Sequence, residues 1–409
     1  MGKPEIRFKG YTDEWEQRKL GEICESFEYG LNAAAKEYDG ENKYIRITDI
    51  DDNSHEFIQD DVTSPDIDLT NSENYQLKYG DVLFARTGAS VGKTYIYKES
   101  DGLVYYAGFL IRGRVKSNYS PEFIFQNTLT DDYDKFIRIT SQRSGQPGVN
   151  AQEYASYEIS VPKFEEQQKI GAYFSTLDHL ITLHQRKCAE IKSLKKYMLQ
   201  KMFPQNEQKV PEIRFEGFTE AWEQRKLGDV AEFSKGSGYS KGDLIESGTP
   251  IILYGRLYTK YETIISDVDT FVEAKDGSVY SKGGEVIVPA SGETAEDIAR
   301  AASVDKSGIL LGGDLNVVMP NEDINSAFLA ISISNGSSQR ELARKAQGKS
   351  VVHIHNEEIR NLIVPFPTKT EQNKIENYFA DLDHLITLHQ QKCEELKKIK
   401  KFMLQKMFV

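Results

Sequence analysis

The sequence predicts an α/β protein made of two copies of one unit, each a mixed α/β module followed by a long helix. Two pairs of matching segments carry this prediction. Residues 4–20 return at 211–227 with 13 of 17 positions identical, and residues 177–203 return at 382–408 with 21 of 27 identical. Because the offsets of 207 and 205 are nearly equal, the whole chain is an internal duplication rather than an array of short repeats.

Each copy opens with a variable module. Runs of β-branched and aromatic residues broken by Gly, Asn and Asp, for example 44–47 and 285–288, predict a substantial sheet. A skeleton is shared, since residues 80–83 correspond to 284–287 and residues 159–162 to 362–365. One framework with different surface residues indicates two modules that recognise different targets, although drift after duplication would leave the same pattern.

A single long helix is expected after each module, because prolines mark its start and none interrupts it. From Glu165 to Phe203 such a helix would be roughly 58 Å long at 1.5 Å per residue. The expected organisation is a first module at 1–162, a helix at 163–203, a linker at 204–210, a second module at 211–367 and a helix at 368–409.

One face of each predicted helix follows the alternating four- and three-residue spacing of a heptad seam. The two seams are the obvious partners for each other, so we expect an antiparallel coiled coil with pseudo-two-fold symmetry. Polar seam residues at matching places, His184 and Lys195 with His389 and Lys400, are expected to fix its register. The other seam residues are Leu177, Ile181, Cys188, Ile191, Met198 and Met202, and Leu382, Ile386, Cys393, Leu396, Met403 and Met407.

Composition excludes several classes of protein. A hydrophobic content of 39% is too high for a disordered chain, and no apolar run of about 18 residues predicts a membrane span. No apolar segment suggests a secretory signal, and three cysteines without a CxxC pair fit a reducing cytoplasm, without a disulfide scaffold or structural zinc. The net charge of −12 argues against binding nucleic acid by bulk charge alone.

Charge is nevertheless uneven along the chain. Residues 177–203 carry six basic and two acidic side chains, and residues 382–408 carry six and three. The two helices therefore offer a basic surface that could face a phosphate backbone, dock an acidic partner or simply be solvated.

Two motifs resemble a phosphate-binding loop and a metal site, but neither has the spacing or the matching residues that such a site requires. Three residues separate Gly88 from Gly92, whereas a phosphate-binding P-loop needs four, and the second copy has no matching lysine. His353 and His355 alternate as on a strand, but their counterparts at a local offset of 203, Asn150 and Gln152, disfavour a metal site.

No amino-methyltransferase motif (Asn or Asp, Pro, Pro, aromatic), GxSxG elbow or HExxH helix is present. We therefore expect no catalytic residue and no metal on this chain, and a role in recognition.

The motifs and their order resemble the specificity (S) subunits of type I restriction-modification systems. The resemblance rests on the WEQRKLG segments from Trp15 and Trp222, the GDVLFARTG block from Gly80, the EQQKI and EQNKI segments at 166–170 and 371–375, and the LDxLI helices. It covers essentially the whole chain.

This resemblance implies two target recognition domains, each recognising in the major groove one half of a bipartite site in double-stranded DNA. The paired helices would set the spacer between the halves and bind two modification (M) methyltransferase subunits, and restriction (R) subunits would complete the complex. No cofactor is implied on this chain, since S-adenosylmethionine, ATP and Mg would be held by the partners.

Two alternatives remain at this point. One is a tandem-module coiled-coil adaptor that binds only proteins. The other is the recognition part of a restriction enzyme with fused catalytic domains, which the absence of a catalytic extension weakens.

The residues expected to contact DNA have side chains that suit phosphates or base edges, although each could equally be a loop or surface residue without a contact. They are Arg46, Thr48, Arg86, Thr87, Ser90, Lys93, Arg143 and Gln146 in the first module, and Tyr254, Arg256, Ser291, Arg300, Lys349 and His353 in the second.

Overall fold

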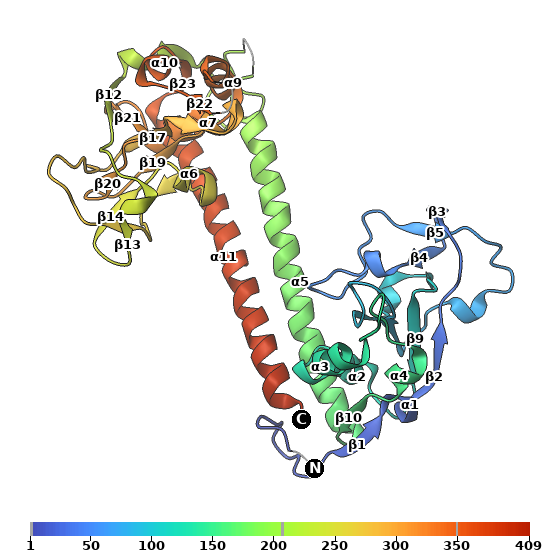
Figure 1. Cartoon of the computed structure of the whole chain (residues 1–409). Coiled ribbons are helices and arrows are strands. Elements are labelled where there is room, and N and C mark those ends of the chain that lie inside the picture. Colours follow the sequence, from blue (N-terminus) through green and yellow to red (C-terminus); the bar gives the residue numbers. More distant parts are fainter. Residues whose placement is uncertain (1–2, 206–207, 349–350) are drawn as a thin grey trace. The chain divides into compact units, whose positions relative to one another are not determined.

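The computed structural model describes residues 3–205, 208–348 and 351–409, and it divides into two compact units. The first unit comprises residues 1–186 with 390–409, and the second comprises residues 187–389. Each unit therefore contains one module and parts of both long helices (Figure 1). No helix within the described residues is both long and apolar enough to cross a membrane.

The first module contains two four-stranded sheets. One has the order β2-β9-β6-β7, all antiparallel, and the other has the order β3-β5-β4-β8, in which β4 and β8 are parallel. Their bounds are β2 Cys24–Tyr29, β9 Leu110–Val115, β6 Asp81–Ala85, β7 Thr94–Ile96, β3 Ala35–Glu37, β5 Thr63–Pro65, β4 Lys43–Ile45 and β8 Val104–Tyr106. The strands β1 (Glu16–Lys19) and β10 (Glu158–Val161) pair separately. The helices are α1 (Leu20–Ile23), α2 (Pro121–Asn127), α3 (Asp131–Thr140) and α4 (Ala151–Ala155), with 3₁₀ turns at Ile47–Asp49, Glu73–Tyr75 and Glu99–Asp101.

The second module repeats this plan with one strand more in its larger sheet. That sheet has the order β12-β21-β17-β19-β15, with bounds Ala231–Lys235, Leu315–Pro320, Glu285–Pro289, Ala302–Val304 and Ile264–Ile265. The other has the order β13-β16-β14-β20, with bounds Leu244–Ile245, Phe271–Val272, Thr249–Ile252 and Leu310–Leu311. Two strand pairs join β11 (Glu223–Lys226) to β23 (Ile363–Phe366) and β18 (Ser291–Gly292) to β22 (Val352–His353). The helices are α6 (Arg256–Thr259), α7 (Ala295–Ile298), α8 (Ser326–Ile333), α9 (Gly336–Lys345) and α10 (Asn356–Arg360), with 3₁₀ turns at Leu227–Asp229 and Lys241–Asp243.

The two long helices are α5 (Phe164–Lys201, 38 residues) and α11 (Lys369–Met407, 39 residues), each unbroken as predicted. In the first unit, the Lys400 ammonium lies 2.6 Å from the Asp178 carboxylate. One turn before Asp178 the ring of Phe174 contacts Phe408, beyond the end of α11, so rising numbers on one helix meet falling numbers on the other. The two segments are therefore antiparallel within this unit.

The second unit repeats these contacts 205 residues apart in the sequence. Lys195 pairs with Asp383 at 2.5 Å, and the Phe203 ring contacts Phe379. The basic seam positions are thus neutralised by an aspartate of the facing helix in both units, and such directional pairs favour one register over a slipped one. The predicted seam turns inward in both helices. Of the fourteen seam residues other than the two lysines, the buried ones are Leu177, Ile181, Cys188, Met202, Leu382, Cys393, Leu396 and Met407, and the half-buried ones are His184, Ile191, Met198, Ile386, His389 and Met403.

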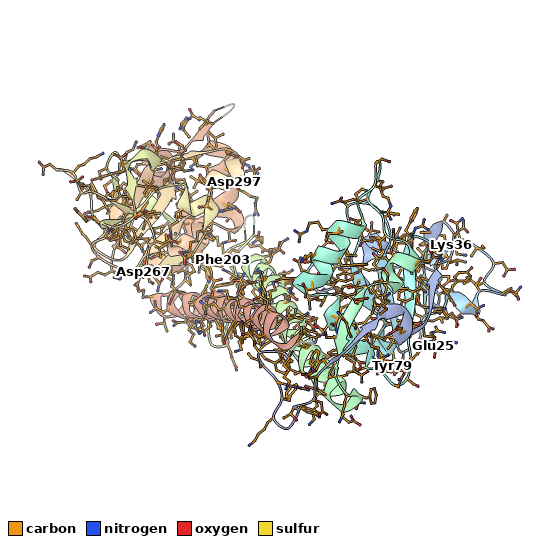
Figure 2. All side chains as sticks on the ribbon, turned by 60° about the horizontal axis from the view of Figure 1, so that its bottom comes forward. Glu25, Lys36, Tyr79, Phe203, Asp267 and Asp297 are labelled. Carbon is orange, nitrogen blue, oxygen red and sulfur yellow. The ribbon has the colours of Figure 1, made fainter. Side chains whose placement is uncertain are left out.

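A buried tryptophan anchors the base of each module. Trp15 meets Phe123 and Phe408 edge-on at ring-centroid distances of 5.7 and 6.4 Å. Trp222 meets Phe328 and Phe203 at 5.8 and 5.9 Å. Figure 2 labels Phe203 where the end of α5 enters the second module. Each matching entry segment therefore contributes a buried tryptophan to the core of its unit, and the identity at this position reflects the same aromatic packing in both units.

Each module is also tied to the start of a long helix by a buried ion pair. Arg7 donates two hydrogen bonds, of 2.7 and 2.8 Å, to Glu166, whose side chain is 1% exposed. The repeat has the same arrangement, since Arg214 donates two bonds of 2.6 and 2.7 Å to Glu371. The next residue, Gln167, accepts a hydrogen bond from the backbone N–H of Ser120, the N-cap of α2. The entry segment, the N-terminus of α2 and the long helix α5 thus meet at the first turn of α5.

We predict that Glu166→Ala destabilises the first unit by about 3–5 kcal/mol, because it leaves the largely buried Arg7 guanidinium without a counter-charge. The matched control is Glu165→Ala, which removes an exposed glutamate and should change stability by less than about 0.5 kcal/mol. Denaturant unfolding of the full chain measures both. Equal midpoints for the two variants would contradict the proposed role of the pair.

Candidate nucleic-acid interface

The two modules hold the same pair of loops, one after β6 or β17 and the other before α4 or α10. In the first module Thr87 forms a bridge with Gly148, and in the second Ser291 pairs with His353. Because this backbone pairing is common to both modules, residues in these loops can be compared position by position.

This comparison corrects one correspondence predicted from the sequence. Val149 donates its backbone N–H to Arg86 O, and Ile354 donates its own to Ala290 O. The local offset between Val149 and Ile354 is therefore 205 and not 203, so the counterpart of His353 is Gly148. His355 corresponds instead to Asn150, and both residues are N-caps of short helices. The offset of 203 came from matching residues 159–162 with 362–365, and the strand pairing corrects that match too: Val161 lies opposite Glu16 and Phe366 opposite the equivalent Glu223, an offset of 205.

A cleft of about 610 Å³ in the first module brings together Arg46, Thr48 and Arg86. The Arg86 guanidinium lies over the Tyr29 ring, 4.9 Å from its centroid. Arg46 is held by two hydrogen bonds of 2.8 Å to Asp49, and these bonds raise the pKa of Arg46. The cleft floor is apolar, formed by Leu31, Ala33, Ala35, Ile47 and Ala107.

Three further candidates lie on the paired loops beside this cleft. Thr87 and Ser90 are half-buried in the turn after β6, and Gln146 is exposed next to Gly88. Gly88 and Gly92 have φ values of 81° and 89°, a region that favours glycine. Their spacing therefore reflects the turn that closes β6 and β7.

Two basic candidates of the first module are engaged elsewhere. The Lys93 side chain is only 10% exposed, donates to Ile50 O at 2.9 Å and forms an ion pair with Asp52. Arg143 is exposed, and its Nη2 donates to both carboxylate oxygens of Glu153. Lys93 is therefore not available as predicted, because its ammonium is bound to groups of its own module.

In the second module three candidates form one cluster. The Ser291 hydroxyl lies 3.2 Å from Nδ1 of the exposed His353, and the backbone carbonyl of Ser291 accepts a hydrogen bond of 2.8 Å from Tyr258. The Tyr254 ring contacts the Tyr258 ring edge-on at 6.2 Å. Arg300 packs over the Tyr261 ring at 5.1 Å and donates to Leu257 O. Aromatic rings beside polar groups are typical of surfaces that contact bases.

Comparison with known proteins tests the resemblance to specificity subunits against the protein-binding adaptor. Residues 12–193 and 219–398 both match the family described as type I restriction modification DNA specificity domain. The chain belongs to this family. Its role is DNA recognition, and an adaptor that binds only proteins is not favoured.

Individual relatives agree over nearly the full length of the chain. The type I restriction enzyme MjaVIII specificity subunit of Methanocaldococcus jannaschii is 21% identical over 410 residues, covering 95% of this chain and 91% of that protein. The crystal structure of a type I restriction-modification system S subunit from M. genitalium is 12% identical, with a TM-score of 0.66, covering 100% of this chain and 99% of that one. At that identity the structural likeness shows the fold.

In this specificity subunit, one predicted DNA contact is engaged inside its own module. The Arg256 side chain is 7% exposed and forms ion pairs with Asp269 at 2.6 Å and Glu262 at 2.8 Å. Hydrogen bonds from Lys260 and from Arg256 lower the pKa of Asp269 to about 2. Arg256 therefore holds its own module together. Lys349 lies outside the described residues, and no group of three metal-binding side chains occurs among those that are described.

The sequence prediction missed two aromatic residues of these specificity domains. Tyr29 supports Arg86, and Tyr258 links Tyr254 to Ser291. Neither stands out in the sequence, because 22 tyrosines are spread over the chain. Only the strand register brings Tyr29 beside the loop after β6.

We predict opposite effects for two arginine variants. Arg86→Ala should weaken binding to the recognised duplex by about 1–3 kcal/mol with little change in stability, because Arg86 faces a surface cleft. Arg256→Ala should lower the free energy of unfolding by about 1–3 kcal/mol, because it removes charge-assisted hydrogen bonds inside the module. DNA titration and thermal unfolding of both variants measure the difference. A stable Arg256→Ala protein with lost DNA affinity would restore Arg256 as a contact.

Proposed function

We propose that this chain recognises a bipartite DNA sequence, one half through each module, within a complex whose other subunits carry out catalysis. The helices α5 and α11 set the distance between the half-sites and bind two modification subunits. Those subunits supply S-adenosylmethionine chemistry, and restriction subunits with ATP and Mg complete the assembly. The chain itself contributes no catalytic residue and no cofactor.

One observation above all supports two separate recognition modules. The backbone frame of the loop pair is the same in both units, whereas the side chains that it presents differ: Thr87 faces Gly148 in one, and Ser291 faces His353 in the other. A shared frame with different exposed groups is expected when two half-sites of different sequence are recognised.

A matching pair of aromatic residues supports two equivalent docking sites on the helices. Tyr197 of α5 and Phe402 of α11 are 205 residues apart and are 48% and 50% exposed. Each lies nine residues after a buried seam cysteine, Cys188 or Cys393, which turns it by about half a circle to the opposite face. Exposed aromatic residues on a helix face are typical anchors of protein interfaces.

The balance of charge supports dependence on partner subunits. The chain has a net charge of −12, whereas affinity for DNA normally depends on neutralising phosphates. We therefore expect the isolated chain to bind DNA weakly and the modification subunits to provide much of the phosphate contact.

The main test exchanges residues 1–160 for the corresponding module of another specificity subunit. Only one half of the methylated sequence should change, because each module contacts its own half-site. Single-molecule methylome sequencing of cells carrying the parent or the exchanged chain reports both halves. A change in both halves would refute the assignment of one module to one half-site.

A second test addresses the proposed docking residues. Tyr197→Asp and Phe402→Asp should each remove one modification subunit from the complex, and the double variant should remove both, with a loss of about 2 kcal/mol or more per site. Native mass spectrometry counts the subunits. Ala189→Glu is the matched control, since Glu394 already occupies the equivalent place in α11. Full assembly of the double variant would exclude these residues as anchors.

A further inference from the structure

An exposed phenylalanine stands at the edge of the cleft in the first module. Phe109, between β8 and β9, is 64% exposed, the highest value for a large apolar side chain among the described residues. It lines the same cleft as Arg86 and Thr48. A single exposed apolar ring is common on protein surfaces, so its meaning depends on the residues around it.

The second module shows that folding does not require it. Arg86 donates its backbone N–H to Phe109 O at 3.0 Å, and the equivalent bond at 2.8 Å runs from Ala290 to Asp314 O. The backbone is thus the same at these two places, but the phenylalanine is replaced by a charged, hydrophilic residue.

The neighbours of Phe109 change in the same way. Strands β2 and β9 lie side by side (Figure 1), and Tyr29 pairs with Ile111 as Lys235 pairs with Asn316. The strands of the two modules are held by equivalent hydrogen bonds, but the side chains at these places differ. Tyr29, Arg86 and Phe109 of the first module correspond to Lys235, Ala290 and Asp314 of the second. The aromatic and cationic edge is a property of the first module alone.

The chemistry of this edge fits one kind of ligand. The floor of the cleft is apolar, and a flat ring can pack against such a surface, while Thr48 and the exposed Asn32 add polar groups to its lining. The Arg86 guanidinium is stacked on Tyr29 and donates a hydrogen bond of 3.4 Å to Gly108 O, and among the described residues no ion pair between it and a carboxylate is found. A ring-accepting cleft with an unneutralised cation at its edge suits a base with its phosphate.

We propose that Phe109 inserts into a base step of the first half-site and that the cleft holds the base displaced from the stack. This inference rests on the proposed function, and it adds an unstacking step specific to the first module. Arg86 faces the adjacent phosphate. The loss of base stacking is offset by stacking on Phe109 and by contact with the apolar floor.

The experiment uses the assembled complex and duplexes that carry 2-aminopurine at each position of the first half-site in turn. Fluorescence of this base rises when it leaves the stack. We expect a severalfold rise at one position with the parent chain and no rise with Phe109→Ala or Phe109→Asp. The same variants should bind the duplex about tenfold more weakly.

Ile139→Ala is the matched control, because Ile139 is 62% exposed on α3 and does not line the cleft. It should leave both readouts unchanged. Since Phe109 is exposed, its variants should keep the parent's unfolding temperature, which excludes misfolding as the cause.

Failure of this inference differs from failure of the proposed function. Tight, sequence-specific binding without a fluorescence rise at any position would overturn base unstacking while leaving DNA recognition intact. An effect of Phe109→Ala that vanishes when thymine is replaced by uracil would also overturn it, since the ring would then only contact a thymine methyl group. A module exchange that leaves the methylated sequence unchanged would instead reject the proposed function.

Discussion

The buried bidentate pairs of Arg7 with Glu166 and of Arg214 with Glu371 are the constraint on which each unit depends. Each fixes the entry segment of a module to the first turn of a long helix, and the adjacent Gln167 or Gln372 binds the backbone of a module helix. A carboxylate that is at most 1% exposed must keep its partner, because an unpaired buried charge is costly. This requirement explains why the segments at the base of the modules stay alike while the loops diverge.

The same contacts reach the far ends of the helices. Ile6 donates its backbone N–H to Lys406 O, and Ile213 donates its own to Lys201 O, so each entry segment joins the start of one helix to the end of the other. Phe408 and Phe203 fill equivalent places against Trp15 and Trp222. The junction around Ile213 directly follows α5 in the sequence. The junction around Ile6 joins the entry segment to the end of α11, which is far away in the sequence. Each unit is therefore defined by the packing of its segments and not by whether these segments are adjacent in the sequence.

The repeat and the seam predicted the α/β class, the unbroken helices and their inward faces, because periodicity and identity depend on local sequence. The contact residues could be predicted only in part. An arginine that stabilises its own module looks the same in sequence as one that faces a ligand, and Arg256 differs from Arg86 only through carboxylates brought close by the fold. Phe109 was missed because its importance appears only beside Asp314, and that correspondence needs the strand register.

The arrangement of charge explains how an acidic chain can serve DNA recognition. Many of its arginines are neutralised internally, including Arg7, Arg46, Arg112, Arg114, Arg143, Arg214 and Arg256. These pairs make the modules rigid but remove charge that would attract phosphates without regard to sequence. Contacts made by the few remaining polar and aromatic groups then contribute a larger share of binding, which favours discrimination between sequences over affinity. Under the proposed function, the general attraction to DNA is left to the partner subunits, so that stable binding requires both a correct sequence and an assembled complex.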